Sequence, residues 1–190
     1  MKRVFIIHGW GGNPREGWFP WLKNELQDKG FTVFVPAMPE TDNPQIPVWV
    51  SHLSGLVGNP DGHTYFVGHS IGCQTVLRYL ETIDSKAGGC VFVAGWFNLL
   101  PQGIPTDAEK AVAKPWLETP IDFEKVKQNT GRIVAIFSDN DDCVPISDEK
   151  LFKERLNAET YVEHLKGHFS AGDGIKELPI ALENILKVAQ

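Results

Sequence analysis

The pentad Gly68-His69-Ser70-Ile71-Gly72 places a serine between two glycines, in the G-x-S-x-G pattern of a nucleophile elbow. A reactive serine needs a sharp turn between a strand and a helix, which approach so closely there that a Cβ would clash. The helix points its N-terminus at the hydroxyl, and its free N–H groups favour a developing negative charge. The pattern predicts a nucleophile at Ser70, provided that the chain also supplies a base, an acid and an oxyanion site.

His168 is the expected base for Ser70. It lies in the run Gly167-His168-Phe169 after the last predicted strand, where a glycine-flanked loop lets an imidazole reach over the sheet edge. A pKa near neutrality suits an imidazole to take the serine proton and return it to a leaving group. His164 is the alternative base, although its side chain at a strand end should point into a sheet face. The two histidines also have the i, i+4 spacing of a metal-binding pair, but that geometry requires a helix and not a strand and loop.

The third group of such a site is a carboxylate that orients the imidazole and stabilises its cation. Asp139, Asp141 and Asp142 all lie in the acidic loop that follows the fifth predicted strand. The residues alone leave the choice among these three open. With any of them, the order serine, aspartate, histidine along the chain is that of an α/β-hydrolase triad.

An oxyanion site needs two N–H donors aimed at the oxygen that becomes negative. Ile71, which follows the serine, is expected to supply one of them, and the glycine-rich loop after the first strand is placed to supply the other. The histidine that closes that strand, His8, is expected to brace this loop. The loop also begins like a dinucleotide-binding turn, but Pro14 stands where the third glycine belongs. The dinucleotide hypothesis is therefore the weaker one, and no cofactor is expected.

Strand-length apolar runs alternate with helical patterns along the chain, which is typical of a parallel sheet whose strands are buried on both faces. The expected strands are residues 3–8, 31–35, 64–67, 90–94, 132–137 and 160–164, and the expected helices are 18–29, 48–57, 71–83, 123–128, 148–157 and 175–188. This predicts one α/β domain over residues 1–190, with a mostly parallel sheet of about six strands and helices on both faces. Ligands of such sheets bind beyond the carboxyl ends of the strands, where the candidate residues lie.

Residues 95–131 form the longest excursion between two strands. The excursion contains Trp96, Phe97 and several prolines, and only its short helix over 123–128 is expected to be regular. A long connection of this kind is a candidate binding lid. Trp96 and Phe97 are expected to wall an apolar acyl pocket together with Phe169 and Trp10.

Five motifs resemble those of α/β-hydrolases, and in particular the small serine hydrolases of the retinoblastoma-binding-protein-9/YdeN group. The motifs are Phe5-Ile6-Ile7-His8-Gly9, Trp18-Phe19-Pro20-Trp21-Leu22, Val67-Gly68-His69-Ser70-Ile71-Gly72, Asp141-Asp142-Cys143-Val144-Pro145 and Gly167-His168-Phe169. In that family the acid lies three residues before a Val-Pro pair, which implies Asp141, with Asp142 as the next choice. The resemblance also implies that the Trp10 N–H is the second oxyanion donor.

The favoured function is therefore a cofactor-independent serine hydrolase that cleaves a carboxylic ester, or a thioester or small amide, of a small-molecule acyl substrate. The reaction would pass through an acyl-enzyme on Ser70. The alternative is a protein-interaction module that keeps the hydrolase fold with little native turnover. An interaction surface has no need of three polar groups at separate strand ends, which argues for the enzyme. No particular protein partner is indicated.

Composition limits which binding partners and which cellular compartment are expected for the protein. The net charge of −6 and the scattered lysines and arginines argue against nucleic acid and against an anionic membrane surface. No apolar run is long enough to span a membrane. The three cysteines, an odd number without a C-x-x-C pair, predict reduced thiols in the cytoplasm and no structural metal. Cys73 and Cys90 are expected in the core, and Cys143 in the acidic loop is the candidate for a more reactive thiol.

Overall fold

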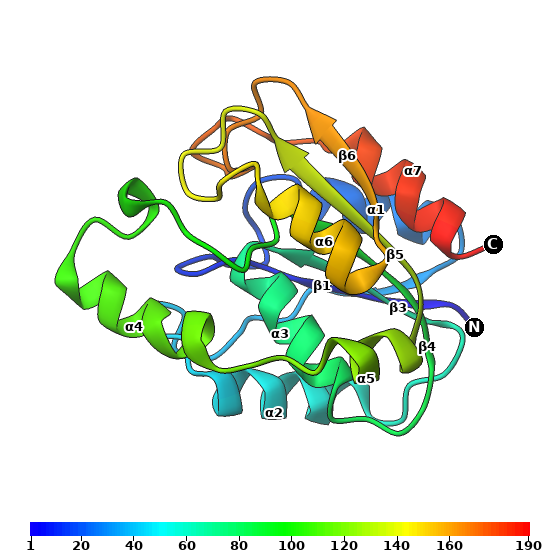
Figure 1. Cartoon of the computed structure of the whole chain (residues 1–190). Helices are drawn as coiled ribbons and strands as arrows, with labels where there is room; N and C mark the ends of the chain where they lie inside the picture. The colour runs from blue at the N-terminus through cyan, green and yellow to red at the C-terminus, as the bar shows by residue number, and fades with distance from the viewer.

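The computed structural model describes residues 1–190 and contains one six-stranded sheet, in the order β2-β1-β3-β4-β5-β6 (Figure 1). All neighbouring strands pair in parallel, so the expected α/β fold is confirmed with a wholly parallel sheet. The strands are β1 (Arg3–Ile7), β2 (Thr32–Phe34), β3 (Thr64–His69), β4 (Ala87–Val93), β5 (Thr130–Ser138) and β6 (Glu159–Glu163). The helices are α1 (Phe19–Asp28), α2 (Ile46–Val57), α3 (Ile71–Leu80), α4 (Asp107–Glu118), α5 (Phe123–Gln128), α6 (Asp148–Leu156) and α7 (Pro179–Val188), with a 3-10 turn η1 at Pro101–Gly103. No helix combines the length and the apolar character that crossing a membrane requires.

Helices cover both faces of the sheet (Figure 1), which explains why β1 is apolar from Val4 to Ile7. Val4 and Ile6 of β1 belong to the core under α1 and α7. Phe5 and Ile7, which point to the opposite face, belong to the core under α2, α3, α5 and α6. Because both faces of β1 are buried, it has no polar side, and its residues read as a continuous run.

The parallel topology brings distant parts of the chain together at one edge of the sheet. The segments that follow β1, β3, β5 and β6 all leave at the carboxyl ends of their strands. These four segments contain the candidate oxyanion loop, the serine, the aspartates and the histidines. The fold therefore gathers at one edge groups that lie up to about 160 residues apart in the sequence, as expected for a parallel sheet.

The turn from β3 into α3 is too crowded for any residue but glycine at two positions. A Cβ at Gly68 would lie 2.8 Å from the backbone of Cys73, and a Cβ at Gly72 would lie 2.3 Å from the carbonyl oxygen of Ile7. Both separations are far below van der Waals contact. The missing side chains let the first turn of α3 rest directly on β1 and β3.

The excursion of residues 95–131 contains a helix, α4, that the sequence analysis did not predict. Its start is a capping box, in which the Thr106 hydroxyl accepts the Glu109 N–H (3.2 Å) and the Glu109 carboxylate accepts the Thr106 N–H (2.8 Å). The sequence analysis expected a helix only over residues 123–128 of this segment and did not use the capping pattern. In the structure Pro115 is accommodated inside α4, and the other prolines flank it.

A buried arginine fastens α4 to α3. The guanidinium of Arg78, a residue only 2% exposed, donates to the carbonyl oxygens of Trp116 (3.0 Å) and Thr119 (2.8 Å). These carbonyls lie at the C-terminal end of α4, where the helix dipole favours a positive charge. The excursion is therefore held firmly at this end.

Two smaller expectations also differ from the structure. The last helix begins at Pro179 rather than at residue 175, since the fixed φ of proline suits the first turn of a helix. Ser147 precedes α6 as expected, but its side chain accepts no hydrogen bond from the helix.

We expect the Gly72→Ala substitution to lower the free energy of unfolding by about 3 kcal/mol, because its methyl group must displace backbone and not a flexible side chain. Gly55→Ala is the matched control. Gly55 lies exposed in α2 with no heavy atom near its ideal Cβ, so alanine there should raise stability by about 0.5–1 kcal/mol. Urea unfolding of the two variants and the wild type measures both effects, and equal stabilities would contradict the crowding argument.

Candidate active site

Ser70 lies at the tip of the turn between β3 and α3. Its backbone has φ 52° and ψ −122°, which side-chain-bearing residues rarely adopt. Such strain persists only where the surroundings impose it, and it is frequent at active sites. The residue is 9% exposed, and its hydroxyl oxygen lies 2.9 Å from Nε2 of His168. The elbow therefore presents the hydroxyl to a histidine that comes from the other end of the chain.

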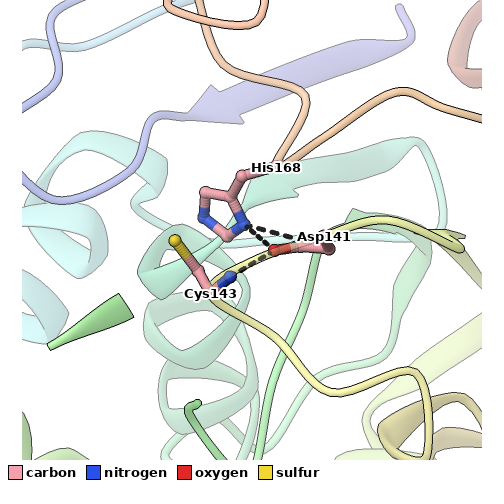
Figure 2. A group of neighbouring side chains, drawn as sticks. All are labelled: Asp141, Cys143 and His168. Carbon is pink, nitrogen blue, oxygen red and sulfur yellow. Dashed lines mark hydrogen bonds and ion pairs between the residues drawn. The ribbon is translucent and has the colours of Figure 1, made fainter. Parts of the chain in front are cut away.

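His168 is held between Ser70 and Asp141. Its Nδ1 lies 2.9 Å from Oδ2 and 3.1 Å from Oδ1 of Asp141. Dashed lines mark these two contacts in Figure 2. Oδ1 of the aspartate also accepts the backbone N–H groups of Cys143 (2.8 Å) and Val144 (2.9 Å), which fixes the carboxylate. Because an ionised carboxylate only accepts, Nδ1 carries the proton and Nε2 is free to accept from the serine. This arrangement can carry out nucleophilic acyl transfer.

The competing acid and base candidates form a separate pair on the surface. The Asp139 carboxylate accepts from the imidazole of His164, whose side chain is 78% exposed, and from the Leu165 N–H. These hydrogen bonds, first the one from Leu165, lower the pKa of Asp139. Asp142 contacts the thiol of Cys143 instead of an imidazole. Of the three aspartates, Asp141 is the one that the structure brings to His168.

Two further groups hold the loop that carries His168. The His69 Nε2–H donates to the carbonyl oxygen of His168 (2.8 Å), while the His69 ring packs edge-on against Trp18. Burial and the nearby His168 lower the pKa of His69 to about 3, so its ring stays neutral at physiological pH. On the far side of the loop, the Asp173 carboxylate accepts the N–H groups of His168 (3.1 Å) and Ser170 (2.9 Å). The base therefore sits on a loop tied down from both sides.

His8 braces the glycine-rich loop as the sequence predicted. Its Nε2 accepts the N–H of Met38 (3.0 Å), so Nδ1 carries the proton and donates to the carbonyl oxygen of Gly9 (2.8 Å). Burial lowers the pKa of His8, which favours this neutral form. The bond fixes the peptide at the start of the loop.

The two proposed oxyanion donors both border the cavity at Ser70. Ile71 is the first residue of α3, and the first N–H groups of a helix have no acceptor within it. The Trp10 N–H donates to no other group of the chain, and the indole of Trp10 is fixed by donating to the Asp42 carbonyl oxygen (3.1 Å). Both N–H groups are thus available to a ligand beside Ser70.

A cavity of about 320 Å³ opens beside Ser70 and His168. Trp10, Trp96 and Phe169 border it, in agreement with the sequence prediction. Phe97 lies outside the cavity, and its predicted place in the pocket was wrong. Its ring stacks on Phe152 of α6, with the ring centroids 4.5 Å apart, and meets Phe123 of α5 edge-on.

Several cavity residues were missed because no local motif marks them. They are Glu16, Gly17, Leu99, Gly103, Ile104, Glu109, Ser170 and Ala171. The capping pattern Thr106-x-x-Glu109 was the available signal for α4, which brings Glu109 to the rim. The other cavity residues come from loops whose paths depend on contacts with distant parts of the chain.

Cys143 does not have the reactivity that its loop suggested. Burial, followed by the neighbouring Asp142 carboxylate, raises the pKa of its thiol to about 12. The thiolate is the nucleophilic form, so very little of it exists near neutral pH. Cys73 and Cys90 are fully buried, as predicted, and burial raises the pKa of Cys90 to about 12.

Comparisons with known proteins agree with the resemblance found in the sequence. A model of the serine hydrolase family matches residues 4–187. YdeN of Bacillus subtilis (strain 168) is 30% identical over 184 residues, which cover 96% of this chain and 93% of that protein. The serine hydrolase RBBP9 of Rattus norvegicus is 26% identical over 170 residues, with 88% of this chain and 87% of that protein covered.

Solved structures extend this similarity to three dimensions. The crystal structure of the ydeN gene product from B. subtilis matches with a TM-score of 0.90 and 29% identity, over 99% of this chain and 98% of that one. Est1E from Butyrivibrio proteoclasticus matches with a TM-score of 0.72 and 15% identity, over 98% and 88% of the two chains. The second similarity is one of fold.

The neutral state of buried His69 makes a prediction about stability and pH. Unfolded histidine takes up a proton near pH 6.5, whereas folded His69 does so only near pH 3, so stability is greatest above pH 6.5 and falls as the pH drops toward 3. At pH 5 the loss from this residue should be about 2 kcal/mol. Glutamine can donate to the same carbonyl but does not titrate, so the His69→Gln protein should lose about 2 kcal/mol less between pH 7 and pH 5. Urea unfolding at both pH values tests this, and equal losses would contradict it.

Proposed function

Because this chain belongs to the serine hydrolase family and has the α/β-hydrolase fold, we propose that it cleaves carboxylic esters through an acyl-enzyme on Ser70. The observation that carries the proposal is the continuous hydrogen-bond chain from Asp141 through His168 to Ser70, with both links at 2.9 Å. Each of the three residues comes from a different segment at the carboxyl edge of the sheet. Thioesters and small amides are the related substrates of the same chemistry.

In the first half of the reaction, the Ser70 oxygen bonds to the substrate carbonyl carbon while its proton passes to Nε2 of His168. The Asp141 carboxylate, which accepts from Nδ1, stabilises the imidazolium that forms. The tetrahedral intermediate then collapses, its bond to the leaving oxygen breaks, and the imidazolium gives that oxygen the proton. Water repeats the sequence on the acyl-enzyme and releases the acid.

The negative oxygen of the intermediate would be held by backbone N–H groups of Ile71 and Trp10. The position of Ile71 at the start of α3 adds the positive end of the helix dipole to this site. The bond from His8 to Gly9 holds the loop that carries the other donor. Donors that are oriented before the reaction cost no reorganisation as charge develops, so they stabilise the transition state more than the substrate.

The cavity suggests a small, uncharged acyl group. Its apolar wall includes Trp96, Leu99 and Ile104, and all three belong to the excursion after β4. This placement supports a lid-like role for residues 95–131, which complete one side of the pocket. Glu16 and Glu109 also border the cavity, and their carboxylates would repel a substrate that carries a second acid group.

Replacing Ser70 by alanine should abolish turnover of a short-chain p-nitrophenyl ester and labelling by a fluorophosphonate probe, since no other group would form the acyl-enzyme. Ester hydrolysis followed by absorbance, and in-gel fluorescence of the labelled protein, measure the two effects. Unchanged labelling of the Ser70→Ala protein would rule out Ser70 as the nucleophile. A wild-type protein that turns over no ester would favour the non-catalytic interaction role instead.

The two adjacent aspartates give a matched pair of variants. Asp141→Asn should lower kcat by about 10⁴-fold, because the amide can no longer hold the required tautomer of His168. Asp142→Asn changes the same kind of group one residue away and should stay within about tenfold of wild type, since Asp142 contacts no imidazole. Steady-state kinetics with one ester measure kcat of both variants. A larger loss of kcat in Asp142→Asn than in Asp141→Asn would identify Asp142 as the acid.

A further inference from the structure

A thiol, an imidazole and a carboxylate converge beside the hydroxyl of Ser70. Donor atoms of Asp141, Cys143 and His168 all lie within 4.8 Å of one another (Figure 2). The catalytic scheme uses the aspartate and the histidine but gives Cys143 no task. We propose that these three residues form a binding site for a soft divalent cation, Zn²⁺ or Cd²⁺, and that the bound cation stops hydrolysis.

The set of donors selects the kind of cation. Sulfur and imidazole nitrogen together suit Zn²⁺ and its heavier relative Cd²⁺, whereas Mg²⁺ and Ca²⁺ require oxygen ligands. The alternative histidine, His164, is paired with Asp139 on the surface and has no thiol in its group. The cluster at His168 is therefore the one that should discriminate between soft and hard cations.

The geometry is close to that of a chelate. Ligand atoms around a tetrahedral Zn²⁺ lie about 3.5 Å apart, so separations of up to 4.8 Å between the donors have to shrink by no more than about 1.3 Å to enclose the ion. Asp141 is fixed by two backbone N–H groups, which makes it the rigid member of the set. Cys143 is half-buried and borders the cavity, so the cation can reach its sulfur by the route that a substrate takes.

Binding of the cation must displace the thiol proton of Cys143. The single hydrogen bond of the thiol, to the Asp142 carboxylate, is 3.4 Å long. On binding, the Sγ–H bond of Cys143 breaks, the Sγ–metal bond forms, and the proton leaves to solvent. No oxidant or other reactant is needed.

Inhibition follows from the use of His168 as a ligand. A cation on Nε2 would occupy the lone pair that accepts the Ser70 proton. A cation on Nδ1 would require the ring proton to move from Nδ1 to Nε2, and Nε2 could then no longer accept the Ser70 proton. Either position removes the base from the hydrogen-bond chain. The loss of activity rests on the proposed function, whereas binding of the cation does not.

Binding is tested directly by titrating chelator-treated protein with Cd²⁺ and following the ultraviolet charge-transfer band of a cadmium–thiolate bond. The wild type should develop the band with one equivalent of Cd²⁺, and the Cys143→Ser protein should not. Cys73 and Cys90 remain in that variant, fully buried, so loss of the band assigns it to Cys143. If the band is absent from the wild type, or persists in Cys143→Ser, the site is wrong while the proposed hydrolase activity stands untouched.

Inhibition is tested by ester hydrolysis with increasing Zn²⁺, each variant being compared with its own rate in the presence of a chelator. Loss of a ligand should raise the half-inhibiting Zn²⁺ concentration of Cys143→Ser by about tenfold or more. His164→Ala, which removes the exposed histidine, should behave as the wild type, and Mg²⁺ should not inhibit either protein. Fluorophosphonate labelling of Cys143→Ser without metal shows that the variant is folded.

The two experiments separate the possible failures. A half-inhibiting concentration that is unchanged in Cys143→Ser would overturn the proposal. A cadmium band without any loss of ester hydrolysis would overturn its inhibitory part, and would also count against His168 as the base. A band together with inhibition, both lost in Cys143→Ser, supports the proposal.

Discussion

The contact between the first turn of α3 and the end of β1 is the constraint on which the site depends. The absence of a side chain at Gly72 lets the helix lie directly on the Ile7 carbonyl. The chain can make this turn only if Ser70 adopts a positive φ, which lifts its hydroxyl above the edge of the sheet. The same contact aims the N-terminus of α3 at the place where the oxyanion would form. The close contact at Gly72 thus sets where the Ser70 hydroxyl lies, how it is oriented and which helix terminus faces it.

The rest of the site is held to this fixed point by buried polar bonds. His69, which belongs to the elbow, donates to the backbone of His168 and so links the nucleophile turn to the loop of the base. Asp148, a fully buried carboxylate at the start of α6, accepts the N–H groups of Phe97 and Asn98 and fixes the beginning of the excursion. Buried polar groups are costly unless they are paired, so these bonds allow few other loop positions. The loops around the cavity are therefore ordered although they have little regular structure.

Most elements, and the serine and histidine of the site, were predictable from the sequence because local patterns mark them. Buried parallel strands read as apolar runs, and Ser70 and His168 stand in recognisable motifs. The acidic loop left three aspartates open, and only the resemblance to the family pointed to Asp141. The structure places Ser70, His168 and Asp141 within hydrogen-bond distance. Phe97 was misplaced because an aromatic side chain after a strand can turn toward the cavity or toward α6, and only packing decides. The helix α4 was missed although a capping box marks its start.

The residues around His168 also explain why a thiol can lie beside a nucleophilic serine without competing with it. A second reactive group in an acyl-transfer site would divert the acyl chain, and a second cationic imidazole would disfavour the imidazolium that the reaction forms. Burial prevents both, since it keeps the Cys143 thiol protonated and the His69 ring neutral. Within the site, His168 and Asp141 are then the side chains that form an ion pair during the reaction. A cation that binds sulfur more strongly than a proton does removes this protection, and the neutral thiol then becomes a ligand at the base.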